Sequence, residues 1–294
     1  MTSPKKILLF GAGGQVGQML VRLADARAVA LDRAAADITN EAAVAHAVRH
    51  YKPDAVVNAA AYTAVDRAET EAVQAFAVNR DGAGYVAAAS ASAGVPLIYI
   101  STDYVFDGAK VTPYREDDPV APLDVYGASK AEGEEAVRRT CPGHIVLRTS
   151  WIYSPYGTNF VRTMLRLAGE RPELSIVDDQ TGCPTAATDI ASAILTILDH
   201  VGRPGFAAWG TYHYRGADIL TWYGFAERIF ALAAERHLKT PRLKPIATKD
   251  HPTSAQRPAY SVLSTVRFEN TFGVAPRPLG ESLAGCLKTL LPPA

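Results

Sequence analysis

Short, unbroken runs of apolar residues alternate with longer amphipathic stretches along the first half of the chain. The apolar runs cover residues 7–10, 29–31, 55–57, 97–100 and 145–147. Strands buried on both faces of a parallel sheet have this continuous apolar character. The stretches between the runs, residues 15–24, 41–49, 71–93 and 125–139, are helically periodic or rich in helix formers. The pattern therefore predicts strand–helix units that feed a doubly wound parallel sheet.

The alternation weakens after Ser150, where prolines interrupt the chain more often. Helices are predicted at residues 159–167, 188–198 and 220–236, and a strand at 209–214. We therefore predict an α/β protein with a Rossmann-type doubly wound parallel sheet and a smaller C-terminal substrate-binding lobe. Residues 1–150 are the predicted dinucleotide-binding domain, to which parts of about 175–200 return, and 151–294 mainly form the substrate lobe.

The composition restricts the kinds of molecule that the protein is expected to bind. Lysine plus arginine and aspartate plus glutamate number 30 each, so no net field favours a nucleic acid or an anionic membrane, and a small molecule is expected. The first apolar run ends at Gly11, too soon for a signal peptide or a membrane span. Cys141, Cys183 and Cys286 are odd in number and far apart in the sequence, which favours a reducing cytoplasm.

Three glycines, Gly11, Gly14 and Gly17, follow the first predicted strand and open the first predicted helix. Glycine permits a tight turn and close backbone approach to a pyrophosphate, while free N–H groups of the helix N-terminus can bind the phosphates. An ordinary glycine-rich turn would share the spacing. The strand before it and the helix after it favour dinucleotide binding.

The end of the second predicted strand bears on the choice of cofactor. Asp32 follows the glycines at the distance where a carboxylate accepts hydrogen bonds from the adenosine ribose of NADH. Arg33 could instead bind the 2′-phosphate of NADPH, or be a solvated charge. Asp37 and Ile38 could flank the adenine. The sequence leaves the choice between NADPH and NADH open.

Small residues follow the third predicted strand. Asn58, Ala59, Ala60, Ala61 and Tyr62 fall at the carboxyl edge of the sheet, where doubly wound folds bind ligands. Alanine-rich loops also pack there for their own sake. The small side chains nevertheless suit close passage of a cofactor.

The candidate chemistry lies at the same edge. Ser101, Thr102 and Asp103 end the fourth predicted strand, and Tyr126 and Lys130, four residues apart, share one face of the next helix. A cation beside a phenol favours its ionised form, so we expect Lys130 to lower the pKa of Tyr126 towards use as an acid or base. Thr102 would hydrogen-bond the reacting oxygen. Alone, the Tyr/Lys spacing is common by chance on helices, and the upstream nucleotide turn gives it weight.

One alternative site is set aside. His46 and His50 are also four residues apart on a predicted helix, as metal-binding pairs can be. No acidic or cysteine partner is nearby in the sequence, and an exposed helix face is the commoner place for such residues. No metal site is predicted.

At this point the sequence resembles the dTDP-4-dehydrorhamnose reductases, a family of the extended short-chain dehydrogenase/reductase superfamily. The resemblance extends over nearly the whole chain. It rests on the segments GAGGQVGQ (residues 11–18), NAAAYTAVDRAE (58–69), STDYVFDG (101–108), YGASKAEGE (126–134), RTSWIY (148–153), DDQTGCPT (178–185), GTYHYRG (210–216) and QRPAYS (256–261).

The resemblance implies a catalytic triad of Thr102, Tyr126 and Lys130. It implies that Asp103 and Trp151 face the sugar and that Arg257, which could equally be a solvated loop residue, binds the nucleotide pyrophosphate. The residues expected around the cofactor, on both grounds, are Gly11, Gly14, Gln15, Val16, Gly17, Asp32, Arg33, Asp37, Ile38, Ala59, Ala60, Ala61, Tyr62, Thr63, Tyr126 and Lys130.

The implied reaction is NAD(P)H-dependent reduction of the C4 keto group of dTDP-4-dehydro-L-rhamnose. A nucleotide-sugar epimerase or dehydratase with retained NAD is one alternative, against which Tyr104 argues because dehydratases typically have glutamate there. A non-catalytic, cofactor-binding regulatory subunit is the other. Tyr260 and Ser264 depart from the family's asparagine and aspartate, which affects the expected substrate contacts. A homodimer is conceivable, but Gln18, Met19 and Leu20 lack the carboxylates through which some relatives share magnesium between subunits.

Overall fold

The computed structural model describes residues 6–291, and a sheet of six parallel strands forms its centre. The strands lie in the order β10-β5-β4-β3-β1-β2. Their bounds are β1 Ile7–Phe10, β2 Ala28–Leu31, β3 Ala55–Asn58, β4 Leu97–Thr102, β5 His144–Thr149 and β10 Gly210–His213. The order reverses between β1 and β3, and doubly wound sheets bind ligands at the carboxyl ends of the strands at such a point.

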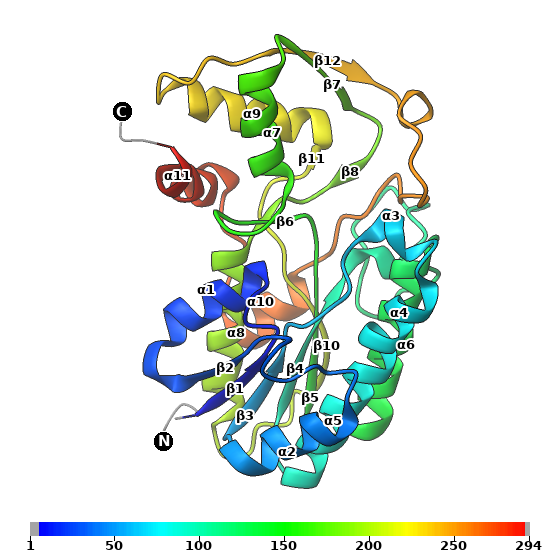
Figure 1. Cartoon of the computed structure of the whole chain (residues 1–294), viewed down its shortest axis with the longest axis vertical. Coiled ribbons are helices and arrows are strands. Elements are labelled where there is room, and N and C mark those ends of the chain that lie inside the picture. The colour runs from blue at the N-terminus through cyan, green and yellow to red at the C-terminus, as the bar shows by residue number, and fades with distance from the viewer. Residues whose placement is uncertain (1–5, 292–294) are drawn as a thin grey trace.

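Helices cover both faces of this sheet (Figure 1). One face is covered by α1 Gln15–Ala24, α8 Ala187–Val201 and α10 Val266–Phe272, and the other by α2 Glu41–Tyr51, α5 Ala83–Ala93 and α6 Val125–Thr140. Successive side chains of a strand point to opposite faces, so Leu9 packs in the first apolar cluster and Leu8 in the second. The arrangement confirms the predicted doubly wound α/β fold.

A third apolar cluster is formed by helices and strands beyond the carboxyl edge of the sheet, in the upper part of Figure 1. The helices and strands of this region are β6 Ile152–Tyr153, α7 Phe160–Glu170, β7 Glu173–Val177, β8 Thr181–Gly182, β9 Thr185–Ala186, β11 Leu220–Thr221, α9 Trp222–Ala234, β12 Arg242–Ile246 and α11 Leu279–Leu290. The chain returns from this region to the central sheet in α8, β10 and α10. The division into residues 1–150 and 151–294 therefore stays a prediction.

Several elements differ from those expected. The helix predicted at residues 71–93 is confirmed as continuous helix, formed by α4 Ala72–Phe76, a π-helical turn η2 Ala77–Gly82, and α5; only the π-helical turn within it was not expected. The strand predicted at residues 209–214 is β10, and it pairs with β5 in the central sheet rather than with the C-terminal lobe. The parallel pair β7 and β12 was not predicted, because β12 carries a proline and charged residues that conceal its character.

The remaining short elements lie around the strand ends. They are η1 Asp25–Arg27, α3 Val65–Ala68, η3 Asp103–Val105 and η4 Thr248–Asp250. None of the helices in residues 6–291 combines the length and apolar character that crossing a membrane would require.

Candidate functional site

The turn between β1 and α1 requires glycine at two positions. Gly11 has a φ of 83°, and a Cβ there would lie 2.4 Å from the backbone nitrogen of Ala60. A Cβ on Gly17 would lie 2.2 Å from the carbonyl oxygen of Gly11. Gly14 caps α1 without a side-chain hydrogen bond. The turn is therefore pressed against the loop after β3, and the first N–H groups of α1 face the space beside it.

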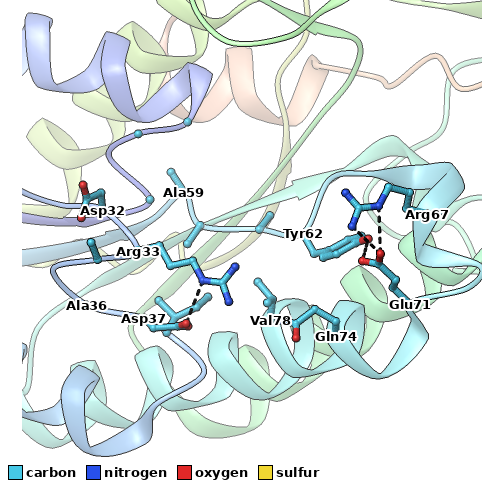
Figure 2. Close-up of a pocket in the computed structure, with 17 residues that line it drawn as sticks. Asp32, Arg33, Ala36, Asp37, Ala59, Tyr62, Arg67, Glu71, Gln74 and Val78 are labelled. Carbon is cyan, nitrogen blue, oxygen red and sulfur yellow. Dashed lines mark hydrogen bonds and ion pairs between the residues drawn. The ribbon is translucent and has the colours of Figure 1, made fainter.

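A cleft of about 730 Å³ begins at this turn and runs along the carboxyl ends of β2 and β3 (Figure 2). It brings together many of the residues predicted to bind the cofactor: Gly11, Gly14, Asp32, Arg33, Asp37, Ile38, Ala59, Ala60, Ala61 and Tyr62. Gly17 packs behind the turn. The alanines line the cleft between the glycine turn and Tyr62, so small side chains leave the space that the sequence suggested.

The charged residues after β2 are held by local hydrogen bonds. Asp32 accepts a hydrogen bond from the backbone N–H of Ala35 at 2.9 Å. Arg33 donates from Nε to Asp37 at 3.0 Å, and its side chain is 76% exposed. The backbone N–H of Thr39, its hydroxyl and then Arg33 lower the pKa of Asp37, although burial opposes them. A carboxylate and a guanidinium therefore both border the cleft, and Figure 2 shows the Arg33 side chain extending along it.

The far end of the cleft contains a cluster that sequence reasoning missed. Tyr62 donates its hydroxyl hydrogen to Glu71 at 2.6 Å, and Arg67 donates to the same carboxylate at 2.5 Å (Figure 2). A buried asparagine also supports the segment: Asn79 exchanges two hydrogen bonds with the backbone of Tyr62, at 2.8 and 3.0 Å. Asn79 lies in the π-helical turn η2, and the expected continuous helix gave no sign of this role.

A second cavity of about 330 Å³ joins the glycine turn to the end of β4. The remaining predicted cofactor residues line it: Gln15, Val16, Thr63, Tyr126 and Lys130. Asp124 caps α6 by accepting a hydrogen bond from the backbone N–H of Gly127 at 2.6 Å, which begins the helix just before Tyr126. Lys130 donates from Nζ to the carbonyl oxygen of Ile100 at 2.6 Å. The structure thus brings Tyr126 and Lys130 to the edge where Thr102 ends β4.

The pKa of Tyr126 moves opposite to the expected direction. Burial raises it, a hydrogen bond with Thr102 lowers it, and the carboxyl groups of Asp103 and Asp124 raise it further. Burial also lowers the pKa of Lys130 to about 7, against the opposing charge of Glu134. The net lowering that we predicted for the pKa of Tyr126 is therefore wrong for this structure. Loss of water outweighs any favourable charge at the phenol.

Asp103 lies in the same buried region. Burial raises its pKa to about 7, although hydrogen bonds with Ser261 and Thr102 lower it. One of its carboxyl oxygens, Oδ2, is buried without a hydrogen-bond partner among the described residues. A buried polar atom of this kind is suited to binding a polar group of a ligand.

Trp151 is less available than its sequence context suggested. Its ring stacks on Trp222 with centroids 3.5 Å apart and planes 4° from parallel. The backbone of Gly182 lies so close that a Cβ there would be 2.3 Å from the indole Cε2. Trp151 itself has a φ of 43°, unusual for a bulky residue. Trp222 therefore covers a face of the ring that we had expected to face a sugar.

Arg257 binds a carboxylate of its own chain. It donates two hydrogen bonds to Asp66, at 3.1 and 2.7 Å. These hydrogen bonds are the largest cause of the lowered pKa of Asp66. The pair joins α3 to the segment before Tyr260. Tyr260 itself is half-buried and bridges to Thr181, and Ser264 donates its backbone N–H to Tyr114 at 2.7 Å.

The two histidines considered for metal binding, His46 and His50, stack on one another along α2 with centroids 5.6 Å apart. Across residues 6–291, no three His, Cys, Asp or Glu side chains gather into a group that could hold a metal ion.

Comparison with known proteins agrees with this geometry. The family model described as "RmlD substrate binding domain" matches residues 5–291. The dTDP-4-dehydrorhamnose reductase of Sinorhizobium fredii is 44% identical over 272 residues, which cover 92% of each chain. The crystal structure of a dTDP-4-dehydrorhamnose reductase from Clostridium acetobutylicum has a TM-score of 0.91 at 38% identity, covering 97% of this chain and 99% of that one. The Bacillus anthracis dTDP-4-dehydrorhamnose reductase, solved in complex with NADP, has a TM-score of 0.89 at 35% identity and covers 96% and 98%.

Proposed function

The chain belongs to the dTDP-4-dehydrorhamnose reductase family, and we propose that it catalyses NAD(P)H-dependent reduction of the C4 keto group of dTDP-4-dehydro-L-rhamnose, giving dTDP-L-rhamnose. Family membership confirms the predicted resemblance, the Rossmann-type fold and the oxidoreductase class. The proposal rests on Tyr126 and Lys130, which both line the cavity that joins the glycine turn to the end of β4, and on Thr102, which contacts the Tyr126 phenol.

The residues of the cleft fit a dinucleotide. Gly11 and Gly17 occupy positions where a Cβ would collide with backbone atoms, so the turn keeps the space beside the N-terminus of α1 open. We propose that this N-terminus binds the pyrophosphate, that Asp32 or Arg33 binds the adenosine ribose or its 2′-phosphate, and that Lys130 binds the second ribose. When bound, the reduced nicotinamide supplies the hydride for the carbonyl carbon.

Residues of the protein then supply the proton that the carbonyl oxygen of the substrate needs. Because burial raises the pKa of Tyr126, its phenol keeps its proton at neutral pH and can donate it to the carbonyl oxygen as that oxygen gains negative charge. Thr102 contacts the same phenol and would orient the reacting oxygen. We propose that a protonated Lys130 stabilises the phenolate left after the proton has moved.

The substrate is proposed to lie between the central sheet and the third apolar cluster. Asp103, with its unpartnered buried oxygen, would bind a sugar hydroxyl. Trp151 would contact the sugar only through the part of its ring that Trp222 leaves free. Arg257 would have to share its guanidinium between Asp66 and the substrate pyrophosphate. The central sheet and its helices would hold the dinucleotide.

Compartment and assembly are further proposals. Cys141, Cys183 and Cys286 are free and buried, which suits a reducing cytoplasm. A homodimer is the assembly that we propose, and light scattering after size-exclusion chromatography would give its mass directly. A monomeric mass at assay concentrations would contradict it.

The test of the function is a coupled assay. Purified protein is given enzymatically generated dTDP-4-dehydro-L-rhamnose with either reduced cofactor, and absorbance at the nicotinamide band is followed beside product formation. We expect one cofactor oxidised per dTDP-L-rhamnose formed, and loss of that activity in Tyr126→Phe.

The two alternatives give different results in the same assay. An epimerase or dehydratase would convert the sugar without net oxidation of added NAD(P)H. A regulatory subunit would bind the cofactor, seen by quenching of tryptophan fluorescence, but would oxidise none of it. Either result would overturn the proposed function.

A further inference from the structure

A fully buried carboxylate lies one helical turn beyond Lys130. Glu134 has no exposed surface and accepts two hydrogen bonds from Arg148, from Nε at 2.8 Å and Nη2 at 2.7 Å. Arg138 donates to it at 2.5 Å, and the hydroxyl of Ser101 donates at 2.6 Å. Each donor comes from a different part of the fold: Arg148 from β5, Ser101 from β4, and Arg138 from the next turn of α6.

These contacts tie together the two elements that carry the catalytic residues. Along β4, the carbonyl oxygen of Ile100 binds Lys130 and the hydroxyl of Ser101 binds Glu134, and the next residue is Thr102. Along α6, Tyr126, Lys130 and Glu134 recur at intervals of four residues and so share one face. The Ser101–Glu134 hydrogen bond therefore sets how the end of β4 lies against the face of α6.

We propose that Glu134 is a positioning residue of the reductase reaction, which fixes Thr102 relative to Tyr126 through Ser101 and places a buried negative charge one helical turn from Lys130. The inference rests on the proposed function. Glu134 does not touch the cavity that Tyr126 and Lys130 line, so it would act through its neighbours and not on the substrate.

The effect of the Glu134 charge on Lys130 follows from the surroundings of the Lys130 ammonium. Its ammonium lies 4.0 Å from the centroid of the Tyr99 ring, a weak compensation for lost water. Burial lowers its pKa to about 7, and the charge of Glu134 is what opposes that shift. Burial would also raise the pKa of Glu134, but Arg148, Arg138 and Ser101 together lower it, so the carboxylate stays ionised.

The other titratable groups around this face keep one charge state near neutrality or lie on the side of Tyr126. His213, beside Arg148 at 3.3 Å, has its pKa lowered to about 3 and is neutral. Tyr99 has its pKa raised well above the usual value. Asp103 and Asp124, with pKa values raised to about 7 and about 6, shift the pKa of Tyr126. Removing the charge of Glu134 should therefore change mainly the pKa of Lys130.

The experiment compares Glu134→Gln with Glu135→Gln, a neighbour on α6 whose side chain is exposed. The readout is kcat/KM for NADPH against pH, which reports groups of the free enzyme. In Glu134→Gln the fall in activity at high pH should move to lower pH by about one unit, a tenfold loss at the alkaline end. Glu135→Gln should keep the wild-type profile.

Two further variants separate positioning from charge. Ser101→Ala keeps the charges but removes the link between β4 and α6, so kcat should fall about tenfold with no shift along the pH axis. Glu134→Asp keeps the charge and should keep the wild-type alkaline limb. An unshifted profile in folded Glu134→Gln, or full kcat in Ser101→Ala, would overturn the proposal. Should Glu134→Gln not fold, full kcat in Ser101→Ala would still overturn the proposal.

These outcomes are distinct from failure of the proposed function. If wild-type protein oxidises no NADPH with the keto sugar, the function itself is wrong. If wild-type protein turns over and the variants share its profile scaled only by the folded fraction, the function stands and Glu134 has a purely structural role.

Discussion

The buried region behind the inner end of the cofactor cleft and the outer end of that cleft use the same kinds of charged residue in opposite surroundings. Behind the inner end, the side chains of Arg148 and Glu134 are 1% and 0% exposed. At the outer end, those of Arg33 and Asp37 are 76% and 33% exposed. Breaking a buried pair leaves an uncompensated charge, whereas an exposed pair is solvated and screened. The inner end is therefore fixed, and the outer end can change its partners when a ligand binds.

The largest effect is expected at the inner end, in the chemistry itself. Tyr126→Phe removes the proton donor without changing the shape of the site, so kcat should fall by about 10²–10⁴-fold. Steady-state assay gives the rate, and fluorescence quenching by NADPH should show binding close to wild type. Tyr104→Phe, in the ring that packs edge-on against Tyr126, is the matched control and should retain far more activity.

The next largest effect is expected in the free energy of unfolding, which should differ between variants of the two regions. Arg148→Met removes the fully buried arginine of the two that pair with Glu134 and should lower the free energy of unfolding by about 3 kcal/mol. Arg67→Met breaks the exposed pair with Glu71 at the outer end and should cost no more than about 1 kcal/mol. Urea unfolding followed by circular dichroism measures both. Equal losses would mean that burial does not separate the two regions.

The two ends should also differ in the sign of their pH dependence. The pKa of Asp103 is raised to about 7 when folded, so its contribution to stability is full below the unfolded pKa of about 3.9 and is lost as pH rises to about 7. Asp103→Asn should therefore gain stability over wild type at pH 8 compared with pH 4, on the order of 2–4 kcal/mol.

Asp37 is the matched control for that measurement. Its pKa is lowered in the folded protein, so its contribution is present above the unfolded pKa and is lost only in acid. Asp37→Asn should then show no gain at pH 8. A parallel pH dependence in the two variants would contradict the assigned pKa directions.

The smallest effect is expected in cofactor choice at the outer end. If Arg33 binds a 2′-phosphate through its exposed guanidinium, Arg33→Ala should raise KM for NADPH about tenfold and leave KM for NADH nearly unchanged. Arg67→Ala, further along the cleft (Figure 2), should change neither by as much. An unaltered ratio of the two KM values would assign recognition to Asp32 alone.

The sequence predicted the central sheet well because strands that are buried on both faces appear in the sequence as unbroken runs of apolar residues. Predicted strand 7–10 is β1 itself, and every residue of it is buried. The glycine turn was predicted equally well, because the positive φ of Gly11 is a conformation that favours glycine, and glycine is visible in the sequence. The same reasoning failed for β12, where lysine and proline occupy a half-exposed strand. It predicted the helix at residues 71–93 but not the π-helical turn η2 within it, because a π-helical turn has no distinct sequence pattern.

The sequence predicted which residues come together at the site but not the pKa values of their side chains. Residue spacing brought Tyr126 and Lys130 together, but it could not show how deeply they are buried, and burial reverses the expected pKa of Tyr126. Asn79 and Glu134 went unnoticed because their partners, such as Tyr62 and Arg148, lie outside their own helices, and local sequence patterns do not show such contacts. The stack of Trp222 on Trp151 depends likewise on tertiary contact.

The most direct test of the central claim follows the transferred atom. Wild-type protein is incubated with dTDP-4-dehydro-L-rhamnose and NADPH that carries deuterium in place of both hydrogens at C4 of the nicotinamide, and the product is examined by NMR and mass spectrometry. The account predicts one deuterium at C4 of the sugar for each NADPH oxidised, with none in Tyr126→Phe over the same time. Product without deuterium at C4, or deuterium at another carbon, would contradict it.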